Sequence, residues 1–136
     1  MNKFTTIISK LFVLFAFLST IGCATSSNFT GPQIEVPQDK AVIYFFRPNA
    51  FAGSAIKFHV HDMQGKPVGY LGKGGDSFSI VVEPGTHQYW SRAASRNDVV
   101  LTVEAGKIYY VKGTVNMGYA VGRPVLQEVT ASEVPK

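Results

Sequence analysis

The sequence lacks the features that mark several large classes of protein. It contains a single cysteine, Cys23, so no disulfide can stabilise the folded chain and its core must do so alone. It has no run of like charges and a formal net charge of only +4, so it carries no electrostatic signal of nucleic-acid binding. Ten Phe, six Tyr and one Trp are present instead, which favours a stable core in a chain of 136 residues.

The usual patterns of enzyme active sites are also missing. No serine lies in a Gly-x-Ser-x-Gly elbow, and the glycine-rich stretch 72–75 completes neither a dinucleotide-binding nor a phosphate-binding loop. His59 and His61 share one strand face beside Asp62, but the spacing supplies no third metal ligand. We therefore predict a non-enzymatic protein without cofactor or metal. These histidines then belong to a solvated strand face, and His87, after a Pro-Gly turn, satisfies nearby backbone groups.

Short β-prone segments alternate with turns from Lys40 onward. The continuous apolar run Ala41–Arg47, ended by Pro48, is typical of a central strand buried on both faces. No segment beyond the N-terminal region has the period of a helix. This pattern favours an all-β domain, either a two-sheet sandwich or a small open barrel. We predict a small antiparallel β-sandwich of about seven to eight strands.

The N-terminal segment has the layout of a secretory signal. Lys3 and Lys10 are its only charges, and a short apolar stretch, residues 11–21, follows them. A transmembrane helix needs about 20 apolar residues, which this stretch does not reach. Gly22-Cys23 resembles the end of a bacterial lipobox. The resemblance implies cleavage before Cys23 and acylation of its thiol and its new amino group, which would hold the protein to a membrane permanently.

Four segments follow from these patterns. Residues 24–39 are rich in Ser, Thr, Gly and Pro, and a coil of this length reaches roughly 20–25 Å.

Ala24 stands where an Asp would favour the inner membrane in proteobacterial lipoproteins. We therefore expect a location at the outer membrane, facing the periplasm. The expected segments are a signal peptide (1–22), a lipidated cysteine with a flexible tether (23–39), the sandwich (40–130) and a frayed tail (131–136).

Several pieces of the predicted domain, in a fixed order, carry a resemblance to a known family. They are Val42–Pro48, Phe51–Ser54, Pro84–His87, Glu104–Val111 and Gly122–Pro124. Behind a lipobox, these pieces resemble an uncharacterised family of bacterial lipoproteins, a domain of unknown function of the 2846 type, over residues 40–129. The resemblance implies a secreted β-sandwich on a lipid anchor. It implies no activity, cofactor or catalytic residue.

Two predicted loops are unusual because they are apolar. Residues 49–53 and 117–121 both contain glycine, and each lies beside an Arg-Pro pair, at 47–48 and 123–124. Surface loops are usually polar, so two apolar loops call for an explanation. One interpretation is that they close the end of the core, with the arginines paired to acids. The other is that they meet and form a partner-binding patch composed of Arg47, Phe51, Met117, Tyr119 and Arg123.

The interpretation that we favour is a lipid-anchored, non-catalytic binding or structural module that contacts another envelope component, such as a protein or a glycan. Tyr89 and Trp90 are neighbours on one strand and point to opposite faces. Either both have a role in the core or between the sheets, or one of them is exposed and can stack on a sugar. The alternatives are a carrier of a small ligand or lipid, which needs a cavity, and a hydrolase of an envelope polymer. The hydrolase is the weakest, because the sequence supplies no set of acid, base and nucleophile.

Overall fold

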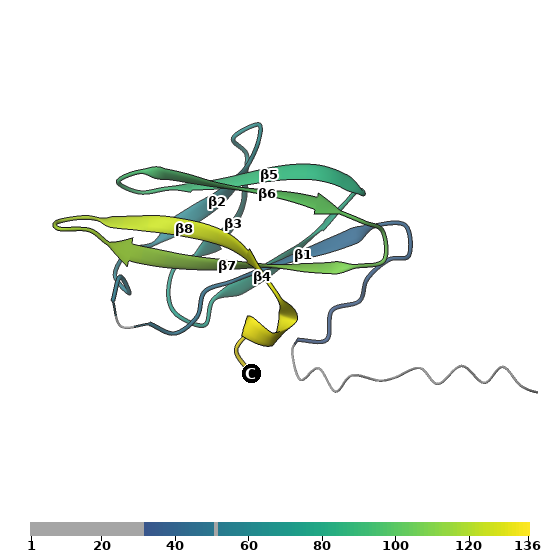
Figure 1. Cartoon of the computed structure of the whole chain (residues 1–136), viewed down its shortest axis with the longest axis horizontal. Helices are drawn as coiled ribbons and strands as arrows, with labels where there is room; N and C mark the ends of the chain where they lie inside the picture. Colours follow the sequence, from purple (N-terminus) through teal and green to yellow (C-terminus); the bar gives the residue numbers. More distant parts are fainter. Residues whose placement is uncertain (1–31, 51) are drawn as a thin grey trace, which may run out of the picture.

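The computed structural model describes residues 32–50 and 52–136. Eight strands form two four-stranded sheets that pack face to face (Figure 1), which confirms the predicted all-β sandwich. The strands in chain order are β1 (Ala41–Phe46), β2 (Phe58–Asp62), β3 (Pro67–Leu71), β4 (Ser77–Val82), β5 (Gly85–Arg92), β6 (Arg96–Val103), β7 (Ile108–Met117) and β8 (Gly122–Val129).

One sheet has the strand order β4-β1-β7-β8 and the other β3-β2-β5-β6. All strand pairs are antiparallel except β1 and β7, which run parallel with Val42 beside Ile108. We expected antiparallel pairs throughout. The exception arises because the chain crosses to the other sheet and back twice between these two strands, so no hairpin turn sets their relative direction.

The core lies between the two sheets and is filled by aromatic and branched side chains. On β1, Ile43 and Phe45 point inward and are completely buried. The ring of Phe45 stacks on Phe78 of β4 at 4.8 Å between centroids and meets Tyr89 of the opposite sheet edge-on at 5.3 Å. These contacts join the two sheets, and they show that Tyr89 belongs to the core.

The C-terminal tail differs from the expected frayed segment. Residues Ala131–Glu133 form a 3-10 turn (η1), and Val134 is buried against Phe46 and Tyr110 on the outer face of the first sheet. Lys112 forms an ion pair with Glu133 at 2.7 Å, which holds the turn in place. The tail docks because Phe46 and Tyr110 would otherwise expose large apolar surfaces. The docked tail also explains why β1 is buried on both faces, as its apolar sequence predicts.

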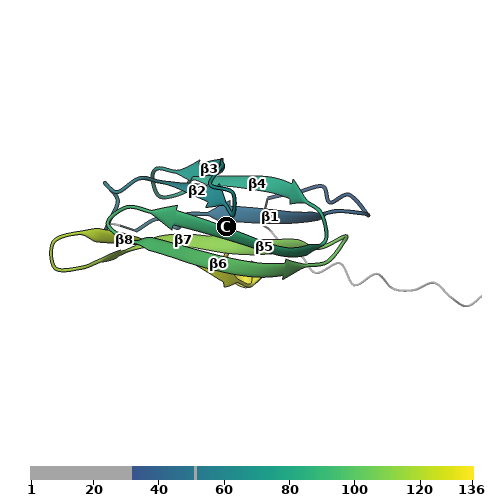
Figure 2. The ribbon, with the colours of Figure 1, turned by 90° about the horizontal axis from the view of Figure 1, so that it is seen from above.

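The edges of the two sheets approach each other on both sides of the sandwich (Figure 2). On one side β6 lies beside β8, where the side-chain Oδ1 of Asn97 accepts a hydrogen bond from the backbone N–H of Leu126. On the other side the ring of Phe78 lies on the backbone of Gly69 in β3, where a Cβ would come within 2.2 Å of the ring. Glycine is therefore required at position 69 by close packing.

Candidate functional site

The β7–β8 hairpin carries the main exposed apolar surface of the described chain. Met117 pairs with Gly122, and the N–H of Gly118 donates to the carbonyl of Val121 at 2.9 Å across the turn. Met117 is 54% exposed and Tyr119 is fully exposed. Val121, the residue before β8, is also exposed. We call residues 117–121 the hairpin tip. Of the two interpretations of this loop, its exposure favours a surface patch over closure of the core, and Val121 is exposed together with the two predicted residues.

The hairpin tip lies at the opposite end of the sandwich from the point where the chain enters it. Ala41 begins β1 beside Val82, the last residue of β4, and we call this end the entry pole. Because β7 runs parallel to β1 from Ile108, its far end at Met117 lies at the other pole. Figure 1 shows the hairpin projecting beyond the other strands at that far pole.

Arg47 does not belong to an exposed patch, which corrects the sequence-based hypothesis for this residue. Its side chain is only 5% exposed and donates to the carbonyls of Ile56 and Gly53, at 2.6 and 2.7 Å. It also donates to the carbonyl of Leu71 at 3.2 Å and lies over the ring of Phe58. The guanidinium is buried because backbone carbonyls, rather than the acids we expected, satisfy its donors.

The segment after β1 packs against the base of the β7–β8 hairpin, and glycines allow the close approach. A Cβ at Gly53 would lie 2.7 Å from Val115 on β7, and Gly53 has the positive φ of +75° that suits glycine. A Cβ at Gly122 would lie 1.9 Å from Cδ1 of Ile56. The loop after β1 therefore packs against the base of the hairpin and supports it. Phe51, the remaining candidate in this loop, lies outside the described residues.

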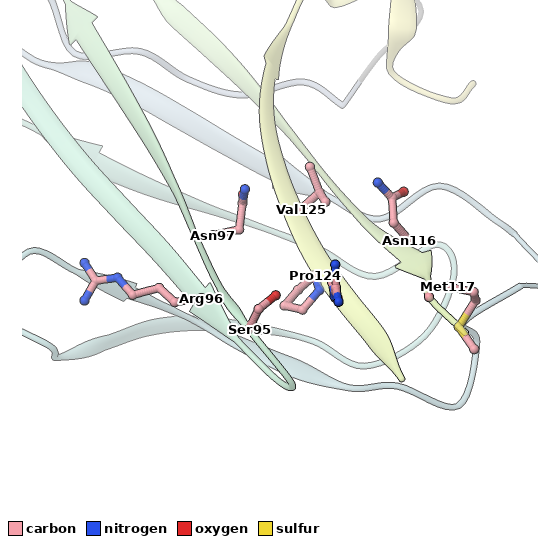
Figure 3. A pocket seen from close by; sticks show the side chains of 9 residues that line it. Ser95, Arg96, Asn97, Asn116, Met117, Pro124 and Val125 are labelled. Atoms are coloured by element: carbon pink, nitrogen blue, oxygen red, sulfur yellow. The ribbon is translucent and has the colours of Figure 1, made fainter. Parts of the chain in front are cut away.

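Arg123 is exposed on β8, opposite Asn116 of β7, and its side chain forms no hydrogen bond or ion pair within the part of the chain that the structure describes. It lines a shallow groove of about 280 Å³ where the start of β6 meets the hairpin (Figure 3). Arg96 also lines this groove, but its guanidinium points away from Met117 and lies over the ring of Trp90. The groove therefore offers one unpaired cation, that of Arg123, beside the apolar tip.

The predicted histidine face is an ordered row on the outer surface of the second sheet. His61 stacks on Trp90 at 4.2 Å between centroids with the rings nearly parallel. Arg96 covers the same ring from the neighbouring strand, with its Cζ at 4.5 Å from the centroid. Because β2 and β6 flank β5 on opposite sides, the two faces of Trp90 are both covered. Trp90 is thus poorly placed to stack on a sugar, which removes the main support for that expectation.

Two further polar side chains, those of His87 and Asp98, have partners close to them in the fold. The Nε2 atom of His87 lies 2.7 Å from the carbonyl of Glu83, which confirms its predicted role beside the Pro-Gly turn. The hydrogen bond from Arg96, and its charge, lower the pKa of Asp98. Within residues 32–50 and 52–136, no group of three or more His, Cys, Asp or Glu side chains is arranged to hold a metal ion.

The proposed lipidation site, Cys23, lies outside the described residues, so its acylation stays a prediction. In the described chain, no helix has the length and hydrophobicity that a membrane span requires.

The geometry defines a small β-sandwich module with a projecting apolar hairpin. The chain belongs to the family described as protein of unknown function (DUF2846), whose model matches residues 37–124. This confirms the resemblance to the domain of unknown function that was inferred from the sequence, and the lipoprotein character stays a prediction. The match includes Arg47, Met117, Tyr119 and Arg123 but not the N-terminal segment with Cys23. No curated protein matches the chain.

Proposed function

We propose that this protein is a lipid-anchored lipoprotein of the cell envelope whose sandwich is a non-catalytic binding module. Its partner is another envelope component, which it contacts through the hairpin tip. The observation that carries the proposal is the exposure of Met117, Tyr119 and Val121 on a hairpin at the pole opposite the chain's entry. Exposed apolar side chains gathered at one place mark interaction sites.

The distance along β7 supports this orientation. Met117 follows Ile108 by nine residues along one strand, which corresponds to about 30 Å at the rise of a β-strand. A domain held by lipid on Cys23 would therefore present the hairpin tip away from the membrane that holds it. The partner then lies on the far side of the domain, beyond the distance that the tether alone reaches.

The chemistry of the tip describes the surface that it fits. Tyr and Arg are enriched among residues that dominate binding energy, and Tyr119 and Arg123 stand on the same hairpin. The matching surface is an apolar recess for Met117 and Tyr119 with a carboxylate placed to pair with Arg123. Envelope proteins offer such recesses more readily than glycans do, so we favour a protein partner.

The packed interior favours a binding module over a carrier of a small ligand or lipid. Phe45, Phe78 and Tyr89 contact one another across the space between the sheets, where a carrier would need a cavity. The hydrolase alternative receives no added support, because His59 and His61 contact Tyr70 and Trp90 rather than a pair of carboxylates.

Site-specific cross-linking in intact cells tests the contact. A photoreactive amino acid at position 119 should give one defined adduct with an envelope protein. The same group at Ala105, exposed in the turn before β7 at the entry pole, is the matched control and should not. Met117→Ser should reduce the adduct from position 119 without changing the melting temperature. Equal adducts from both positions, or adducts only with abundant porins, would contradict the proposal.

The anchor has its own test. Cys23→Ala should move the protein from the membrane fraction to the soluble periplasmic fraction and abolish incorporation of labelled palmitate. Cys23→Ala protein that stays in the membrane fraction would show that the chain is held in another way.

A further inference from the structure

The second sheet has a gap beside β5. Strand β2 pairs with β5 only from Val60, opposite Ser91, to Asp62, opposite Tyr89. The chain then turns away into the β2–β3 hairpin, whereas β5 extends back to Gly85. Residues 85–88 therefore pair with β6 on one side and with no described strand on the other. In an antiparallel strand, alternate N–H and C=O groups point to each side, so part of this backbone faces the gap unpaired.

A groove of about 420 Å³ occupies this gap. Met63, in the β2–β3 turn, and Val100, on β6 opposite Gln88, both line it and are both exposed. Tyr89, whose side chain is buried, also lines it. The residues that line the groove are Asp62, Met63, Gln64, Thr86, His87, Gln88, Tyr89 and Val100.

Most side-chain polar groups around the groove already have partners. Thr86 contacts Thr102, Gln88 donates to Asp98, and Nε2 of His87 lies against the Glu83 carbonyl. The capacity that remains includes the backbone edge of β5 and one carboxylate oxygen of Asp62, whose Oδ1 accepts the N–H of Lys66 at 2.8 Å.

The charge of the groove is negative. Among the described residues that line the groove, Asp62 is the only Asp, Glu, Lys or Arg. Its carboxylate lies close enough to the phenol of Tyr89 to contribute, after burial, to raising the pKa of that group to about 12. A ligand with a cationic side chain near Asp62 is therefore favoured.

We propose that this groove binds an extended peptide segment of a partner protein, which pairs with the free edge of β5 at residues 85–88. One apolar side chain of the peptide packs between Met63 and Val100, and a lysine or arginine pairs with Asp62. Unpaired backbone groups at the spacing of a β-strand are matched by a peptide backbone and not by a glycan or a lipid, and addition of a strand is a recurring mode of peptide recognition.

This site is independent of the hairpin tip. Gly85 lies opposite Val103 near the entry pole, whereas Met117 lies at the far pole. Failure of one site therefore leaves the other untouched.

Hydrogen exchange of the full chain, purified in detergent micelles, tests the proposal. The probe is a pool of acetylated hexapeptides in which Val, Ile or Thr alternates with Lys or Ser. The control pool has the same sequences with alternate backbone nitrogens methylated, which removes the donors needed for strand pairing. The first pool should slow exchange at residues 85–88 about tenfold or more, and the methylated pool should not.

Two exposed valines provide a matched pair of variants. Val100 is 57% exposed beside the groove, and Val81 is 59% exposed on β4, in the other sheet. Val100→Thr should weaken binding of the pool severalfold, and Val81→Thr should leave it unchanged. Asp62→Asn should remove the preference for peptides that contain Lys, without abolishing binding of those with Ser.

Several outcomes would overturn the proposal. The methylated pool could protect residues 85–88 as well as the first pool does, or the first pool could give no protection at millimolar concentration. Protection could also fall on β4 or the hairpin tip instead of residues 85–88. Finally, the two valine substitutions could have equal effects on binding.

Discussion

The side-chain Oδ1 of Asn97 on β6 accepts a hydrogen bond from the backbone N–H of Leu126 on β8 at 2.7 Å. The two strands belong to different sheets and cannot form a regular ladder with each other. The amide side chain takes the place of that ladder, satisfies a backbone donor in a largely buried residue and closes one side of the sandwich.

Loss of this link should destabilise the fold. Asn97→Ala leaves the Leu126 N–H without an acceptor, so we expect the free energy of unfolding to fall by about 1–2 kcal/mol, measured by urea denaturation. Asn97→Asp, which keeps an acceptor at the same place, should cost less. Asn116→Ala changes an exposed amide on the neighbouring hairpin and should stay within about 0.5 kcal/mol of the wild type. Equal losses in the Asn97→Ala and Asn116→Ala variants would show that the link carries no stability.

Arg47 should matter for folding rather than for binding. Arg47→Met keeps the apolar part of the side chain but leaves several buried carbonyls without a donor, so we expect a loss of about 3 kcal/mol in the free energy of unfolding. Arg92→Met, at an exposed position on β5, is the control and should change stability by less than about 0.5 kcal/mol. Similar melting temperatures for the two variants would argue that Arg47 is dispensable to the core.

The contact between Gly69 and Phe78 can be tested with a double-mutant cycle. Gly69→Ala places a Cβ within 2.2 Å of the Phe78 ring and should cost about 1–3 kcal/mol through overpacking. In a Phe78→Leu background the ring is gone, so the same alanine should cost much less. An equal cost in both backgrounds, measured by thermal unfolding, would place the strain elsewhere.

The raised pKa of Tyr89 predicts that the folded protein loses stability at high pH. Burial, followed by the charge of Asp62, raises the pKa of its phenol to about 12 in the folded protein, above the ordinary value of 10.0. Between these values the unfolded chain has lost this proton and the folded chain has kept it. The contribution is therefore fully present below pH 10 and disappears as the pH rises toward 12, a change of about 2–3 kcal/mol.

Comparison with Tyr89→Phe isolates this effect from other groups that titrate in the same range. The free energy of unfolding of both proteins should be measured with denaturant at several alkaline pH values. Above pH 10, that of the wild type should fall relative to that of Tyr89→Phe. Burial also raises the pKa of Tyr110, but that residue is present in both proteins and cancels. Parallel pH profiles would mean that the Tyr89 phenol ionises as it does in water.

Much of the local structure was predictable because local patterns report it. The apolar run at residues 41–47 indicated a buried central strand, and the strand observed is β1, Ala41–Phe46. The Pro-Gly turn at residues 84–85 indicated the local role of His87. The apolar loop 117–121 indicated an unusual surface, and it is the exposed hairpin tip.

Other features depended on partners that are distant in sequence. Nothing around Arg47 shows that carbonyls from residues 53, 56 and 71 converge on it, so an arginine beside an apolar loop resembled a surface residue. The tail after Val129 has too few apolar residues to predict that Val134 docks on Phe46. The groove beside β5 exists because β2 ends its pairing at Asp62, which is a property of register between strands.

By itself, the sequence determined the fold class, the family and the expectation of an anchor at Cys23, because alternation, turn residues and short motifs act within a few positions of the chain. Only the tertiary structure decided the parallel pairing of β1 and β7, and with it that the hairpin tip lies at the pole opposite the chain's entry. Pairing between distant strands depends on how whole faces bury together, and no short stretch of sequence encodes that.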